Sequence, residues 1–100
     1  MNQSSTHAGA TVALVGPGRA GTALAMALVA AGHEIVAVAG RAPDAPGVVA
    51  AASRFSAPAV PSAVAGRDAS LVLLAAPDAA IRDAAAEVTP GLRPDALVLH

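Results

Sequence analysis

Short apolar runs alternate with alanine-rich stretches along the chain. The runs rich in valine, leucine and isoleucine predict parallel strands that are covered on both faces. They occupy residues 10–15, 34–39, 71–76 and 96–100. A weaker run at residues 57–60 contains Pro58 and precedes Pro61, so it predicts at best a short strand, the third in chain order.

The alanine-rich stretches have the composition of helices. In residues 20–31 apolar positions recur at helical spacing, and Gly32 follows where the C′ residue of a helix is expected. The expected apolar face consists of Leu24, Ala27, Leu28 and Ala31. Residues 48–55 predict a short second helix, and residues 79–88 predict a third with Asp78 as its N-cap. The apolar face of that third helix consists of Ile81, Ala84, Ala85 and Val88.

This alternation predicts an α/β domain with a parallel sheet and right-handed crossovers. We expect a Rossmann-like, doubly wound sheet with strand order 3-2-1-4-5. Residues 11–100 would form one dinucleotide-binding domain, and residues 1–10 a disordered tail. A complete dinucleotide fold has about six strands, so we expect the chain to be truncated before the last strand and a C-terminal domain.

The sequence GPGRAG, a GxGxxG pattern, lies between the first strand and the first helix. Gly16 would allow a sharp turn out of the strand, Gly18 would let the backbone approach a pyrophosphate, and Gly21 would let the helix pack close to the sheet. The free amides of the first helical turn would bind the anion without a charged side chain. The alternative is an ordinary tight turn, but the strand before the motif and the helix and strand after it favour a dinucleotide site.

The end of the second strand bears on the choice of dinucleotide. In NAD sites an acid about 20 residues after the motif bonds the adenosine ribose, but here Gly40 and Arg41 occupy that position. A cation would attract the 2′-phosphate of NADP, so we expect NADP rather than NAD, with Arg19 as a second phosphate contact. The alternative is that Arg41 is a solvated loop residue. Glu34 begins the strand, at its wrong end, and Asp44 would reach the ribose only if its proline-rich loop folded back.

Open α/β sheets bind ligands at the carboxyl ends of their strands. We expect Ala76 and Pro77 there to line the nicotinamide half of the crevice. His100 could contact the nicotinamide carboxamide, and the alternative is a structural histidine. Asp78 is better explained as a helix N-cap than as a catalytic acid, and no catalytic residue is assigned. The expected cofactor-binding residues are Gly16, Pro17, Gly18, Arg19, Ala20, Gly21, Gly40, Arg41, Ala76, Pro77 and His100.

Composition limits the expected partners. The formal net charge is -1, with six arginines and no lysine, so there is no basic stripe for nucleic acid. The longest uncharged apolar stretch, residues 20–32, covers about 13 residues, whereas a membrane crossing takes roughly 20. Cysteine is absent, which fits a reducing compartment, so we expect a cytoplasmic protein. His7, His33 and His100 do not converge in the expected fold, and we expect no metal site.

Several of these stretches together resemble a known family. They are GPGRAG, the strand ending AGR, the strand ending APD before a helix, and the terminal LVLH. They are similar to the N-terminal Rossmann-like domain of a family of NADP oxidoreductases whose second, helical domain is of unknown function. The wider relatives are 6-phosphogluconate dehydrogenase-like enzymes, including ketopantoate, pyrroline-5-carboxylate and deazaflavin-linked NADP reductases. In the family a serine and a glycine typically follow the histidine that matches His100, and this chain does not reach them.

The resemblance covers residues 11–100 and implies a fragment of a longer protein or an isolated cofactor half. Related enzymes commonly dimerise through the helical domain that is missing here, so we expect the full-length protein to be a homodimer. Such a protein would transfer hydride between NADP and a small carbonyl or imine substrate. The 100 residues alone would hold the cofactor and choose no substrate, so we do not expect them to be active alone. The main alternative is a non-catalytic dinucleotide-binding module with a regulatory or redox-sensing role. S-adenosylmethionine or FAD is less compatible with Arg41, because both usually require an acid at this position.

Overall fold

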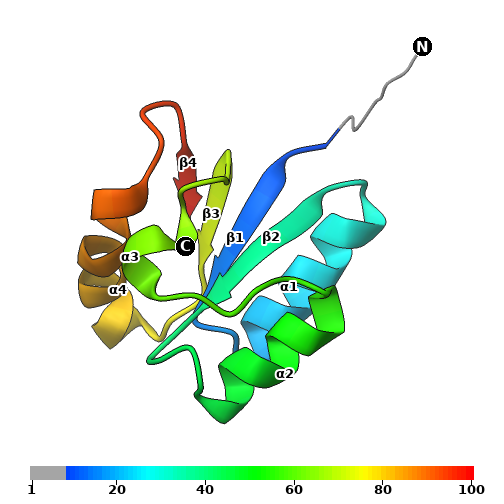
Figure 1. Cartoon of the computed structure of the whole chain (residues 1–100), viewed down its shortest axis with the longest axis horizontal. Helices are drawn as coiled ribbons and strands as arrows, with labels where there is room; N and C mark the ends of the chain where they lie inside the picture. The colour runs from blue at the N-terminus through cyan, green and yellow to red at the C-terminus, as the bar shows by residue number, and fades with distance from the viewer. Residues whose placement is uncertain (1–8) are drawn as a thin grey trace.

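A parallel four-stranded sheet forms the centre of the computed structural model, which describes residues 9–100 (Figure 1). The strands are β1 (Thr11–Val15), β2 (Glu34–Ala39), β3 (Leu71–Leu74) and β4 (Leu97–Leu99). All neighbouring strands pair in parallel, in the order β2-β1-β3-β4. The predicted α/β class, with a Rossmann-like parallel sheet, is therefore confirmed. Most of the tail predicted at residues 1–10 lies outside the described residues.

The predicted strand order 3-2-1-4-5 is not the one observed, because residues 57–60 do not form a strand. They meet β2 only in an isolated parallel bridge between Val38 and Ala59. The Val38 amide donates to the Pro58 carbonyl, and the Val60 amide donates to the Val38 carbonyl, both at 2.9 Å. Pro58 has no amide hydrogen to donate to β2, so the ladder does not extend toward the amino end of this segment.

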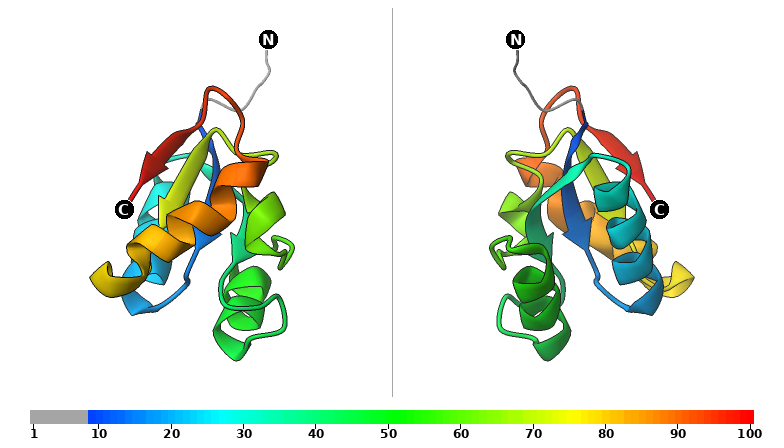
Figure 2. Two further views of the ribbon diagram at one scale, coloured as in Figure 1. Left: turned by 90° about the vertical axis from the view of Figure 1, so that its left-hand side faces the viewer. Right: turned by 90° about the vertical axis from the view of Figure 1, so that its right-hand side faces the viewer.

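Helices cover both faces of the sheet and make a three-layer molecule (Figure 2). Helices α1 (Arg19–Ala30) and α2 (Pro46–Phe55) lie on one face, and α3 (Ser62–Ala65) and α4 (Ile81–Val88) lie on the other. The sequence pattern does not predict α3, because four residues are too few to show a helical period. Short 3-10 turns precede and follow α4, at Asp78–Ala80 and Thr89–Gly91.

The side chains of β1 alternate between two apolar layers. Val12 and Leu14 pack in the layer under α1 and α2, whereas Ala13 and Val15 pack in the layer under α3 and α4, and all four are buried. Burying a side chain the size of valine or leucine contributes about 1.5–3 kcal/mol to stability. This packing holds β1 between β2 and β3, with the carboxyl ends of all three strands at one edge of the sheet.

The buried face of α1 differs from the predicted face. Gly21 and Ala25 are buried and Leu28 is partly buried, whereas Leu24 is 48% exposed. Most of the helix is apolar, so hydrophobicity does not select a face, and the smallest side chains pack inward because they allow close approach. The end of the helix is as predicted. Gly32 has a φ of +99°, and the amides of Gly32 and the next residue bond back to the last turn at 3.0 Å, in a Schellman motif.

The last helix begins later than predicted. Its N-cap is Ala80 and its first residue is Ile81, so the assignment of Asp78 as the N-cap is wrong. The Ala80 amide donates to the Pro77 carbonyl at 2.7 Å, and this tighter bond makes the first turn a 3-10 turn. The apolar face is as predicted. Ile81, Ala84, Ala85 and Val88 all pack in the apolar layer under α4.

One hydrogen bond at the amino edge of the sheet ties the start of β1 to β2. The Ala10 amide donates to Nδ1 of His33 at 2.8 Å. We predict that His33→Ala lowers the free energy of unfolding by about 1 kcal/mol, because this partly buried amide loses its acceptor. Urea denaturation measures the change. The control Arg93→Ala removes an exposed ion pair with Asp95 and should cost less than about 0.5 kcal/mol. Equal losses would contradict the role given to His33.

Candidate functional site

The carboxyl ends of β1, β2 and β3 border a crevice of about 640 Å³. The starts of α1 and α2 complete its wall. It brings together the residues expected to bind the cofactor, with the exception of Gly21 and His100. Those on its wall are Gly16, Pro17, Gly18, Arg19, Ala20, Gly40, Arg41, Ala76 and Pro77. Segments far apart in the sequence therefore meet at one edge of the sheet (Figure 1).

The turn after β1 depends on glycine at its first position. Gly16 has a φ of +82°, a left-handed conformation that glycine adopts without steric cost. Its amide donates to the Ala39 carbonyl at 2.8 Å, which ties the turn to the end of β2. A Cβ at this position would lie 3.3 Å from the amide nitrogen of Ala76, just beyond β3. Gly16 therefore lets the ends of the three strands stay close together.

Helix α1 begins with amides that have no partner within the helix. The N-cap is Gly18, and the first intrahelical bond runs from the Thr22 amide to the Gly18 carbonyl at 2.9 Å. The helical hydrogen-bond pattern leaves the amides of Arg19, Ala20 and Gly21 free. No acid stands in this first turn. Free amides and the positive end of the helix dipole make this end of α1 attractive to an anion.

Gly18 and Gly21 have opposite surroundings. A Cβ at Gly18 would have no heavy atom within 4 Å, so this position faces open space. A Cβ at Gly21 would lie 2.5 Å from the Cβ of Ala75 and 3.2 Å from the Gly16 carbonyl oxygen. Gly18 therefore leaves room for a ligand in the crevice, whereas Gly21 lets α1 lie close to the end of β3.

The chain leaves β2 through Gly40 and Arg41, beside the start of α2. A Cβ at Gly40 would lie 2.6 Å from Cγ2 of Val48, so glycine is needed for this approach. The next side chain, Arg41, is exposed and borders the crevice. The cation expected at the end of the second strand therefore stands on the same wall as the glycine turn.

Among the side chains that the structure describes, those of residues 9–77 and 79–100, no acid lines the crevice. Glu34 begins β2 at the opposite edge of the sheet, and Asp44 is not on the crevice wall. A neighbouring hollow of about 220 Å³ instead places Asp83 and Glu87 of α4 beside Arg41. Sequence reasoning missed these two acids, because helical spacing identifies them only as the polar side of α4. Their position beside Arg41 depends on how α4 packs against the sheet.

Ala76 and Pro77 line the crevice, but His100 borders a separate hollow of about 400 Å³. The hollow shares Ala20, Ala75 and Ala76 with the crevice, and its wall is mostly apolar. Gly21 also lies on that wall. His100 therefore stands beside the crevice, at the end of β4, and not within it.

Metal ligands do not gather in the described part of the chain. Residues 9–100 contain no group of three or more histidine, aspartate or glutamate side chains that could hold a metal ion. His33 lies at the amino edge of the sheet, far from the strand end that carries His100, and His7 lies outside the described residues. Among the helices of residues 9–100, none combines the length and the apolar character needed to span a bilayer.

Two comparisons with known proteins identify similar sequences and folds. The model of a family described as "NADP oxidoreductase coenzyme F420-dependent" matches residues 11–99. Among solved structures, the chain is similar to a Bacteroides fragilis protein assigned as an NADP oxidoreductase, with a TM-score of 0.78 and 24% identity. The match covers 93% of this chain but only 36% of that longer one, and at this identity it shows a shared fold. No curated protein sequence matches the chain.

Proposed function

The chain belongs to the family of coenzyme F420-dependent NADP oxidoreductases, and from this premise we propose that residues 11–100 bind NADP as the cofactor module of an oxidoreductase. The complete protein would transfer hydride between the nicotinamide ring and a small carbonyl or imine substrate. Coenzyme F420, which the family description names, is the alternative hydride partner. The observation that supports the proposal best is the crevice, where the free amides of α1 adjoin the open space at Gly18.

The pyrophosphate of the cofactor would lie at the start of α1. Gly18 leaves the space, and the backbone of Arg19 and Ala20 supplies donors on the crevice wall. These donors are held by the helix, so they need no rearrangement when the anion binds. The Arg19 guanidinium adds a charged donor at the same place.

Arg41 supports the choice of NADP over NAD. Its guanidinium is exposed at the end of β2 and forms no ion pair with an acid of the described residues. It is therefore available for bidentate contact with a 2′-phosphate. Among the described side chains of residues 9–77 and 79–100, none on the crevice wall is a carboxylate, whereas NAD sites usually provide one for the ribose hydroxyls.

The crevice can hold and orient a cofactor. Among the described side chains, those of residues 9–77 and 79–100, the charged ones on its wall are arginines, and none is a carboxylate or an imidazole. The nicotinamide half would extend past Ala76 and Pro77 toward the hollow that His100 borders. We therefore assign the substrate pocket and the proton donor to another domain, in keeping with the 36% share of the longer structural neighbour that this chain spans.

The face of β4 supports the placement of that second domain. Leu97 and Leu99 on this edge strand are 60% and 43% exposed, and Leu24 of α1 is also exposed. An apolar surface of this kind is typical of a contact with further protein. In this proposal a C-terminal helical domain contacts this face, forms the homodimer, and works in the cytoplasm.

A non-catalytic dinucleotide-binding module, with a regulatory or redox-sensing role, is the alternative function. It is favoured because, among the described side chains of residues 9–77 and 79–100, the crevice wall carries no acid and no histidine. A turnover assay distinguishes the enzyme from the binding module. Steady oxidation of NADPH by the longer protein with a carbonyl, an imine or coenzyme F420 as acceptor supports the enzyme, and tight binding without turnover on any of them supports the module.

We predict that Arg41→Ala weakens NADPH binding by about 1.5–3 kcal/mol, the worth of one charge-assisted contact, and leaves NADH binding nearly unchanged. Only NADPH carries the 2′-phosphate that this side chain would hold. Titrations that follow nicotinamide fluorescence measure both affinities. Arg67→Ala removes an exposed arginine outside the crevice and is the matched control. Equal losses for NADPH and NADH would refute the assignment of Arg41.

A further inference from the structure

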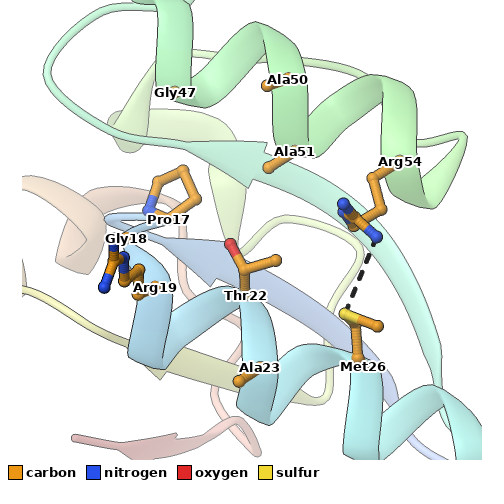
Figure 3. A pocket seen from close by; sticks show the side chains of 10 residues that line it. All are labelled: Pro17, Gly18, Arg19, Thr22, Ala23, Met26, Gly47, Ala50, Ala51 and Arg54. Atoms are coloured by element: carbon orange, nitrogen blue, oxygen red, sulfur yellow. Dashed lines mark hydrogen bonds between the residues drawn. The ribbon is translucent and has the colours of Figure 1, made fainter.

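A second hollow, here called the α1–α2 groove, runs between these two helices with a volume of about 420 Å³ (Figure 3). Each helix lines it with one stripe of residues at i, i+3, i+4 and i+7 spacing. The stripes are Arg19, Thr22, Ala23 and Met26 from α1, and Gly47, Ala50, Ala51 and Arg54 from α2. Because most of these side chains are small, the groove stays open. It meets the dinucleotide crevice at four residues that border both, which are Pro17, Gly18, Arg19 and Gly47.

The groove carries positive charge, and no acid stands among the described residues of its wall. Arg19 stands at the end near the glycine turn, and Arg54 stands toward the other end (Figure 3). Nη1 of Arg54 lies 3.9 Å from the sulfur of Met26, which is a weak acceptor. No acid of the described residues forms an ion pair with Arg54. Its remaining donors are therefore available to an oxyanion.

Thr22 places a hydroxyl in the same groove, pointing into the space between α1 and α2 (Figure 3). A threonine inside a helix commonly bonds a carbonyl of the preceding turn, as Thr89 does with the Ala85 carbonyl at 2.7 Å. The Thr22 hydroxyl forms no such bond within the described residues, although the side chain is only partly exposed. It is therefore a second free polar group on the wall of the groove.

The part of the groove farthest from the glycine turn lies outside the dinucleotide crevice. Ala50, Ala51 and Arg54 line the groove but not the crevice. A cofactor bound at the glycine turn would therefore leave this part of the groove open. The combination of two arginines, one hydroxyl and an alanine floor suits a ligand that joins an oxyanion to a small apolar body.

We propose that the α1–α2 groove is a second binding site, which takes a small organic phosphate. The phosphate group lies against Arg54 and Thr22, and the apolar body lies along Ala50 and Ala51. Arg19 borders both the groove and the crevice, so an anion bound in one lowers the affinity of the other for a second anion. The groove and its arginines are present whether or not the crevice binds a dinucleotide, so this proposal does not rest on the proposed function.

Titration of the isotope-labelled chain with phenyl phosphate, followed by NMR, tests this site. We expect saturable shifts of the Ala50 and Ala51 amides. Inorganic phosphate lacks the apolar body and phenol lacks the charge, so each should bind at least about tenfold more weakly. Arg54→Gln should lower the affinity for phenyl phosphate about tenfold or more, and Thr22→Val should lower it severalfold while keeping the side-chain shape.

Two controls separate this site from its alternatives. Arg67→Gln makes the same change in net charge away from the groove and should leave the affinity within about twofold. Arg54→Gln should still bind NADPH, because Arg54 is not on the crevice wall. The proposal is overturned if only the amides of Ala20 and Gly21 shift, if phenyl phosphate leaves Ala50 and Ala51 unmoved, or if the two arginine variants lose equal affinity.

Discussion

Replacing Gly18 with threonine should abolish NADPH binding and leave the fold intact. A Cβ at Gly18 meets no heavy atom within 4 Å, and its φ of -98° and ψ of -166° suit a β-branched residue. Threonine and glycine are similarly good N-caps, so the free energy of unfolding should change by less than about 0.5 kcal/mol. The new side chain would fill the space of the pyrophosphate. NADPH affinity should fall by at least about 100-fold, or roughly 2.7 kcal/mol.

Fluorescence titration and urea unfolding of the same preparation measure the two effects. NADH should lose as much affinity as NADPH, because both carry the pyrophosphate. Gly47→Ala is the matched control on the crevice wall, since its added Cβ would lie 3.5 Å from the Pro17 carbonyl oxygen, an ordinary contact. It should bind NADPH nearly as the parent chain does. Full NADPH binding by Gly18→Thr would mean that the pyrophosphate does not lie at this glycine.

Gly21→Val should have the opposite profile, with its main effect on stability. The added Cβ would lie 2.5 Å from the Cβ of Ala75 and 3.2 Å from the Gly16 carbonyl oxygen. Helix α1 must then move away from the sheet or distort its first turn. We expect the free energy of unfolding to fall by about 3 kcal/mol, the upper end for overpacking a buried site. Dinucleotide binding should weaken as well, because the free amides of α1 move with the helix.

Urea denaturation of the Gly21→Val and Gly18→Thr variants under the same conditions compares their losses in the free energy of unfolding. Both variants place a β-branched residue at a glycine of the same motif, but only one of them faces a filled space. A loss below about 1 kcal/mol for Gly21→Val would show that α1 can leave the end of β3 at little cost. The structural explanation of the third glycine would then be wrong.

The glycine turn and the residues around it could be placed from the sequence, because the features that place them are local. Gly16 follows an apolar run that can only be a strand, and the residues after it form a helix. Parallel strands end at the same edge of a sheet, so Arg41 and Ala76 had to lie near that turn. Their contact with a cofactor is still a prediction, which the binding experiments above would test.

Features that depend on packing could not be predicted in this way. The predicted buried face of α1 was wrong because Leu24 and Ala25 are both apolar, so the pattern does not distinguish them. The tight contact at Gly21 turns the smaller residues toward the sheet. His100 directly follows β4, but it lines a hollow that shares only part of its wall with the crevice. Asp83 stands beside Arg41 because of the place of α4 on the sheet. No local pattern contains that information.

The most direct measurement follows backbone amide resonances of the labelled chain while NADP⁺ is added. If the pyrophosphate binds at the start of α1, we expect the largest shifts at Arg19, Ala20 and Gly21, together with a shift at Arg41 that NAD⁺ does not reproduce. Inorganic pyrophosphate should move the amides of the α1 start in the same direction, without the change at Arg41. Saturable binding of NADP⁺ that leaves these amide resonances unshifted, or that shifts mainly the resonances of residues around His33, would contradict a pyrophosphate site at the start of α1.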